Sequence, residues 1–221
     1  MAMIQFQERI IENKDWTIML FVFSFGLIAV IRSLFETRFN DFLNLIVSDK
    51  YIKIYKDSSH LKSWFTAILF FAQLVSFSFF VQLILHYFGY CSKFDFLIFI
   101  RIFTFLNVFV LSKFLIEKII AVSFDIEEFI EQFNLNKVSY RTYFGISLLP
   151  INAILYFNEN INIVYIYVIF ISIIVINVVI YIKSLKIYQN LVLSNLFYFI
   201  LYLCTLEIAP YYFIYYWFTR P

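Results

Sequence analysis

Long apolar segments separated by short charged ones run along the whole chain. A helix crosses the ~30 Å hydrocarbon core of a bilayer with roughly 20 apolar residues, because it rises about 1.5 Å per residue. Charged residues bound the candidate segments, which cover residues 16–31, 64–89, 94–116, 144–157, 161–182 and 187–217. The pattern therefore predicts an all-α, polytopic bundle of about six transmembrane helices.

Two of the predicted cytoplasmic loops have helical apolar spacing of their own. The first predicts an amphipathic helix that lies either in the membrane interface or packed beneath the bundle. Its apolar positions are Phe35, Phe39, Phe42 and Ile46. The second predicts a helix whose polar face is acidic, formed by Asp125, Glu127, Glu128 and Glu131. Anionic lipid repels such a face, so we expect it to meet basic protein, either Lys50, Lys53 and Lys56 of this chain or a partner.

Composition narrows the class further. Of 221 residues, 63% are hydrophobic and only 14% are charged, against about 45–50% and 25% in soluble domains. The net charge of +2 gives no indication of nucleic-acid binding. Since no linker, repeat or low-complexity tract interrupts the pattern, residues 1–221 are expected to form one membrane domain.

Lysine and arginine counts predict the orientation, because basic residues accumulate in cytoplasmic loops. With six spans, the two faces carry very unequal numbers. Four lie on the side of the termini: Arg9, Lys14, Lys93 and Arg220. Twelve lie on the opposite side: Arg32, Arg38, Lys50, Lys53, Lys56, Lys62, Lys113, Lys118, Lys137, Arg141, Lys183 and Lys186. Both termini are therefore predicted outside the cytoplasm.

Ionisable groups inside apolar spans are costly, and each one suggests a functional site. Arg101, Glu207 and His86 all fall in the outer half of the predicted bundle, and Gln82 precedes His86 by one helical turn. One hypothesis is an Arg101–Glu207 pair with His86 nearby, serving as a proton or substrate site. The alternative, which we favour, is a structural ion pair that fixes helix order, with His86 bonded to a carbonyl group.

Pro210 and the two cysteines raise smaller questions. Pro210 follows Glu207 by three residues and is expected to break or kink the last helix, because proline lacks an amide donor. Cys91 and Cys204 both project toward the outer half. A disulfide is conceivable there, but buried free thiols are expected.

Lys113, Glu117 and Lys118 sit where the third span leaves the membrane. They are interpreted as a salt-bridged interfacial turn and not as a site.

Catalytic and cofactor motifs are not found. The sequence has no HExxH, GxSxG or P-loop pattern, and its two histidines are too few for a metal cage. We predict no catalytic residue, no metal and no cofactor.

Two stretches resemble a known family. They are residues 9–16, ahead of the first span, and residues 197–212, which contain Leu206, Glu207, Ile208, Pro210, Tyr211 and Tyr212. The sequence is similar over nearly its whole length to an uncharacterised membrane family of Bacteroidota, a domain of unknown function. The resemblance implies a multi-pass inner-membrane protein of a Gram-negative cell, with both termini periplasmic on the charge count. It transfers no activity to any residue.

Three functions compete at this stage. We favour a non-catalytic subunit or scaffold of a cell-envelope complex, with protein export as one context, whose partners are lipid and other membrane proteins. The alternative is a small proton-coupled transporter or channel that uses Arg101, Glu207, His86 and Gln82. An intramembrane lipid-modifying enzyme is the third, with thin support from one acid, one base and one histidine.

Overall fold

The computed structural model describes residues 14–46, 50–55, 63–123, 127–158 and 163–187, together with Tyr212 and Tyr216. Within these residues the protein is all-α, with seven α-helices and one short 3-10 helix. The predicted sixth span, including Glu207, Pro210 and Cys204, lies outside the described residues apart from Ile187 and the two tyrosines.

Four helices are long and apolar enough to cross a membrane. They are α1 (Asp15–Leu34), α5 (Trp64–Tyr87), α6 (Phe96–Ser123) and α8 (Ile163–Ile187), whose apolar part is Ile163–Ile180. They correspond to the first, second, third and fifth predicted spans. Exposed aliphatic and aromatic side chains cover α1, α6 and α8, as expected where lipid is the solvent. The protein is therefore an integral membrane protein.

Helix α7 joins two segments that the sequence pattern separates. The acidic loop helix and the fourth span (residues 144–157) are one continuous helix, Glu127–Phe157, of 31 residues. The prediction of two elements was wrong because Lys137 and Arg141 were taken as loop charges. No proline or glycine interrupts the helix between Glu127 and Tyr143, and its apolar positions continue through that region.

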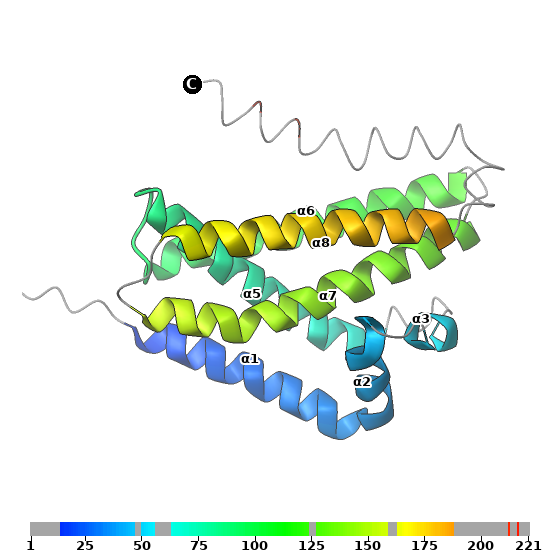
Figure 1. Ribbon diagram of the computed structural model, residues 1–221, viewed down its shortest axis with the longest axis horizontal. Helices are drawn as coiled ribbons and strands as arrows, with labels where there is room; N and C mark the ends of the chain where they lie inside the picture. Colours follow the sequence, from blue (N-terminus) through cyan, green and yellow to red (C-terminus); the bar gives the residue numbers. More distant parts are fainter. Residues whose placement is uncertain are drawn as a thin grey trace, which may run out of the picture.

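The helices are arranged around the α5–α7 pair, the most extensive helix contact of the described part. Helix α1 packs on one side of this pair, and α6 and α8 lie on the other (Figure 1). Gly145 permits the close approach, since a Cβ atom there would lie 2.4 Å from Cγ and 3.3 Å from Cα of Gln73.

Neutral polar side chains link α5 and α7 along their length. Thr142 Oγ1 donates to Gln73 Oε1 at 2.8 Å, and Asn152 Nδ2 donates to the Ser76 carbonyl at 2.7 Å. These four residues are buried. Hydrogen bonds between helices in a membrane contribute roughly 0.6 kcal/mol each, with a maximum near 1.7, so the links fix register more than they add stability.

Aromatic rings fill the space between α1, α5, α6 and α7. The Phe79 ring stacks on Phe21 at 4.3 Å between centroids, and contacts Phe99 at 4.7 Å and Tyr156 at 5.0 Å. All four are nearly fully buried. The large number of phenylalanines thus supplies rigid packing where the hydrophobic effect between helices is absent.

The first amphipathic segment packs beneath the bundle, which is one of its two predicted placements. It forms α2 (Glu36–Leu43) and η1 (Asn44–Ile46), followed by α3 (Lys50–Ile54). Phe39 and Phe42 are buried in the same core cluster as Phe65 of α5. Phe35 keeps 36% of its surface exposed, so the apolar face is only partly covered.

Arg38 ties this loop to the start of α5. Its guanidinium donates to Ser63 Oγ at 2.9 Å and lies over the rings of Phe65 (4.4 Å) and Tyr55 (4.8 Å). Ser63 in turn caps the N-terminus of α5. The hydroxyl group and the two aromatic faces thereby stabilise the charge of this buried arginine.

Candidate functional site

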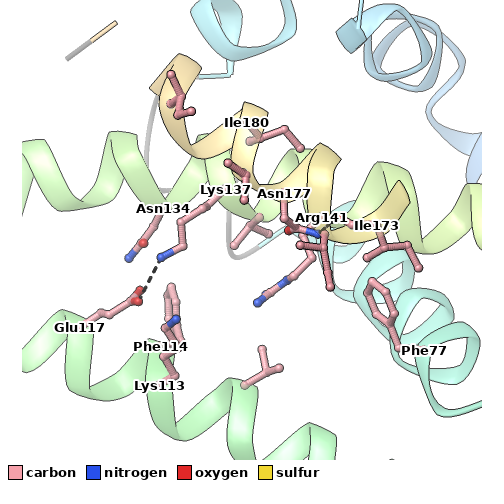
Figure 2. Close-up of a pocket in the computed structure, with 15 residues that line it drawn as sticks. Phe77, Lys113, Phe114, Glu117, Asn134, Lys137, Arg141, Ile173, Asn177 and Ile180 are labelled. Carbon is pink, nitrogen blue, oxygen red and sulfur yellow. Dashed lines mark hydrogen bonds and ion pairs between the residues drawn. The ribbon is translucent and has the colours of Figure 1, made fainter. Parts of the chain in front are cut away.

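A cavity of about 650 Å³ lies between α6, α7 and α8, with Phe77 of α5 at its edge. Its volume is within the range of small-molecule sites. Six polar side chains from three helices line it, and Figure 2 shows how they lie around the cavity. They are Lys113 and Glu117 from α6, Asn134, Lys137 and Arg141 from α7, and Asn177 from α8.

Helical spacing explains why these groups converge. Lys113 and Glu117 are four residues apart on α6, and the three α7 residues recur at intervals of three and four. Residues at such spacing share one face of a helix. Figure 2 shows Lys137 and Arg141 projecting from α7 toward α6.

One ion pair connects the two helices across the cavity. Lys137 Nζ lies 3.3 Å from Glu117 Oε1, and the Glu117 side chain is only 5% exposed. The lysine also lies over the Phe133 ring at 5.4 Å. A buried carboxylate needs such a partner, because an isolated buried charge is very costly.

The cavity has a net positive charge. Three cationic side chains line it with one carboxylate, a formal charge of +2. At an effective dielectric constant of about 20, an anion 4 Å from one of these cations gains on the order of 4 kcal/mol before desolvation costs are subtracted. The arrangement therefore favours an anionic ligand over a cationic one.

The remaining wall is apolar and continuous with the lipid-facing surface. Ile174, Val178 and Ile182 of α8 line the cavity, yet each is exposed, by 48%, 52% and 60%. Arg141 also borders a smaller cavity of about 160 Å³ between α5, α6 and α7. The site thus combines a charged end with an apolar side that opens toward the membrane.

This site was not predicted from the sequence. Lys113 and Glu117 were interpreted as an interfacial turn, but Glu117 pairs with Lys137 of another helix. Asn134, Lys137 and Arg141 already share one helical face in the sequence. That spacing was the available signal, and the assumption of a loop obscured it.

The predicted intramembrane cluster is only partly assembled in the described residues. Gln82 is buried and His86 half-buried near the end of α5, while Arg101 is exposed on α6. No hydrogen bond or ion pair joins Arg101 to either of them in this part of the chain. The predicted Arg101–Glu207 pair and the helix break at Pro210 fall outside the described residues and remain predictions.

Gln82 and His86 bind the backbone of the α5–α6 turn. Gln82 Nε2 donates to the Asp95 carbonyl at 2.8 Å, and its Oε1 accepts from the Tyr156 hydroxyl at 3.0 Å. His86 Nδ1 lies 3.0 Å from the Cys91 carbonyl. Both side chains therefore hold the backbone of this turn.

Other helices also hold this turn, which covers residues 88–95. Trp16 Nε1 of α1 donates to the Phe94 carbonyl at 3.0 Å, and Lys93 Nζ donates to the Asn158 carbonyl at 3.1 Å. Asp95 accepts from the amides of Leu97 and Ile98, at 3.0 and 3.2 Å, at the start of α6. The turn is thus fixed by α1, α5 and the end of α7 together.

Cys91 is a free thiol within this turn. Burial raises the pKa of the Cys91 thiol above its ordinary value, and the Asp95 carboxylate raises that pKa further. The group therefore stays protonated at neutral pH and is a poor nucleophile. Its predicted companion Cys204 is not among the described residues.

The predicted acidic partner face lies at the start of α7. Glu127 is exposed and Glu131 half-buried, while Asp125 and the side chain of Glu128 are outside the described residues. In the part of the chain that the structure describes, no group of three or more His, Cys, Asp or Glu side chains could hold a metal ion.

A family model for a domain of unknown function matches residues 17–218. It covers the helix bundle, the charged cavity and the last predicted span. Neither the curated proteins nor the solved structures contain a match to this chain.

Proposed function

This chain belongs to DUF4271, a family described as a domain of unknown function, and from its geometry we propose that it is a non-catalytic scaffold subunit of a larger complex in the bacterial inner membrane. It would cross the membrane six times with both termini periplasmic. The function would be to hold partner proteins at a fixed place on the cytoplasmic face.

The fixed α5–α7 interface carries this proposal. Secondary transporters move one part of the bundle against another around a central site. Here the two central helices are joined by buried neutral pairs, Gln73–Thr142, Ser76–Asn152 and Gln82–Tyr156. Sliding these helices would break several hydrogen bonds in a place without water, so the arrangement supports a static role.

The lengths of α6 and α7 suggest where a partner would bind. With 28 and 31 residues, these helices are about 42 and 46 Å long, against a hydrocarbon core of ~30 Å. The excess length continues beyond the lipid on the side of the basic loops. Glu127 and Glu131 lie on this extension, which supports a partner with a basic surface.

Site-specific crosslinking in native membranes tests the proposal. A photo-crosslinking residue placed at position 127 is expected to capture one protein in stoichiometric yield, through a segment rich in lysine or arginine. Reversing the charges with Glu127→Lys and Glu131→Lys should reduce co-purification of that protein several-fold, because it replaces attraction with repulsion.

Glu36→Lys is the matched control. Glu36 is an exposed acid on α2, on the same predicted side of the membrane but away from α7, so its reversal should leave recovery unchanged. If the gently solubilised protein runs alone and position 127 yields no defined crosslink, the scaffold proposal is wrong.

A further inference from the structure

We propose that the cavity between α6, α7 and α8 binds the phosphate group of an anionic phospholipid, with an acyl chain along the apolar wall of α8. The site would be separate from the acidic face at the start of α7. Lipid binding in this cavity would not depend on the proposed scaffold role.

The polar end of the cavity matches a phosphate. Lys113, Lys137 and Arg141 line the cavity together with one carboxylate, Glu117, so that the lining has a formal charge of +2. Arginine and lysine together are the usual partners of phosphate oxygens in proteins. Basic pockets between transmembrane helices on the cytoplasmic side recur as sites for anionic headgroups.

A buried amide adds a second observation. Asn134 is only 4% exposed and lines the cavity, and its Oδ1 has no hydrogen-bond partner among the described residues. A buried acceptor without a donor is unfavourable. A headgroup with hydroxyl groups, such as the glycerol of phosphatidylglycerol, would supply that donor beside the phosphate.

The apolar wall favours a lipid over a free anion. Ile174, Val178 and Ile182 belong both to the cavity lining and to the exposed surface of α8. A lipid could therefore enter sideways from the bilayer, with its headgroup at the cations and its chain against these side chains. Inorganic phosphate would use the charged end alone.

Native mass spectrometry of the full-length protein in detergent tests the assignment. Phosphatidylglycerol should bind at least about tenfold more tightly than phosphatidylcholine with the same acyl chains. The double variant Lys137→Gln/Arg141→Gln should lose at least about tenfold of the phosphatidylglycerol affinity, because charged hydrogen bonds to phosphate are lost. Lys118→Gln is the control, since Lys118 is exposed on α6 and does not line the cavity.

A pair of tryptophan variants separates lipid from free phosphate. Val178→Trp obstructs the apolar wall and leaves every charge in place, whereas Val175→Trp adds the same bulk at an exposed position outside the lining. Val178→Trp should weaken phosphatidylglycerol binding, and Val175→Trp should not. Both positions face outward, so folding is retained, which matching thermal unfolding curves would verify.

Three outcomes would contradict the proposal. Equal binding of phosphatidylglycerol and phosphatidylcholine would exclude recognition of the headgroup's negative charge by the cationic side chains. Equal affinity losses in Lys118→Gln and in the double variant would place the lipid elsewhere. Competition by inorganic phosphate that depends on Lys137 and Arg141, without any effect of Val178→Trp, would assign the site to a free anion and overturn its lipid ligand.

Discussion

Polar side chains have different partners at the two ends of the bundle. At the α5–α6 turn, Gln82, His86, Trp16 and Lys93 are each directed at a backbone carbonyl group. At the other end, Lys113, Lys137 and Arg141 face a cavity of about 650 Å³. The turn uses polar groups to hold the backbone, whereas the cavity leaves cations beside space that a ligand could fill.

In a membrane protein without recognisable motifs, a ligand site is better sought where charged side chains border a cavity than where polar side chains hold the backbone. Burial alone does not distinguish the two ends, because Gln82 and Glu117 are both buried. What distinguishes them is the partner. At the turn Gln82 binds a backbone carbonyl group, whereas Glu117 binds the Lys137 side chain of another helix beside a cavity. The second arrangement is the one that a ligand can enter.

The largest effect is expected at Gly145, which sits between the two ends and holds them in register. Gly145→Leu forces α7 away from Gln73 and should cost on the order of 3 kcal/mol or more of stability, because overpacking a tight contact displaces backbone. The thermal unfolding midpoint in detergent should fall by many degrees. Gly26→Ala is the control, since nothing lies within 4 Å of its Cβ position, and an unchanged midpoint for both variants would refute the close approach.

A comparison of Gln82→Ala with the double variant Glu117→Gln/Lys137→Gln should separate the ends next. Gln82→Ala leaves the buried Tyr156 hydroxyl without its acceptor and removes the side-chain donor to the Asp95 carbonyl, which keeps the Phe99 amide. The loss should cost about 2 kcal/mol. The double variant Glu117→Gln/Lys137→Gln should cost less than about 1 kcal/mol, since replacing both members of the pair by neutral side chains leaves neither charge buried without the other. Denaturation monitored by circular dichroism measures both.

The reverse ranking of these two variants would show that the turn is the adaptable end. A double-mutant cycle of Gln82→Ala with Tyr156→Phe then isolates the pair, for which we expect a coupling of roughly 0.6 to 1.7 kcal/mol.

The smallest effect concerns the reactivity of Cys91 as pH changes. With Cys204→Ser removing the other cysteine, the rate of maleimide labelling should keep rising above pH 9, because burial and the Asp95 carboxylate raise the pKa of the thiol. Asp95→Asn removes the second cause, lowers that pKa and should speed labelling at pH 8 a few-fold. A rate that saturates below pH 8.5 would mean that the turn is open to water.

The lengths of the apolar segments predicted four helices of the bundle, whereas the positions of charged residues did not reliably separate loops from helices. The spans that became α1, α5, α6 and α8 are apolar runs in which length alone is decisive. Helix α7 was predicted as two elements, because the charges of Lys137 and Arg141 do not by themselves show whether these residues face water or a cavity between helices. Only the packing of α6 and α8 against α7 distinguishes these cases.

The hydrogen-bond partners of the polar side chains could not be predicted from the sequence either. Gln82 and His86 were identified from the sequence as polar groups of the second span, and the structure places them in the last two turns of α5. Their actual partners are carbonyl groups of residues 91 and 95, which depend on the path of the turn at Gly89, where φ is +79°. A backbone path of this kind leaves no periodic signal in the sequence.

The bond from Trp16 to the Phe94 carbonyl sets an order on biogenesis. Its acceptor lies 78 residues further along the chain, so the first helix enters the membrane well before the ribosome has made the group that fastens it. The carbonyl that Lys93 contacts comes later still, at Asn158. The end of the bundle that holds the α5–α6 turn is therefore completed late in translation, and nascent chains that end before Phe94 should leave the indole without its acceptor.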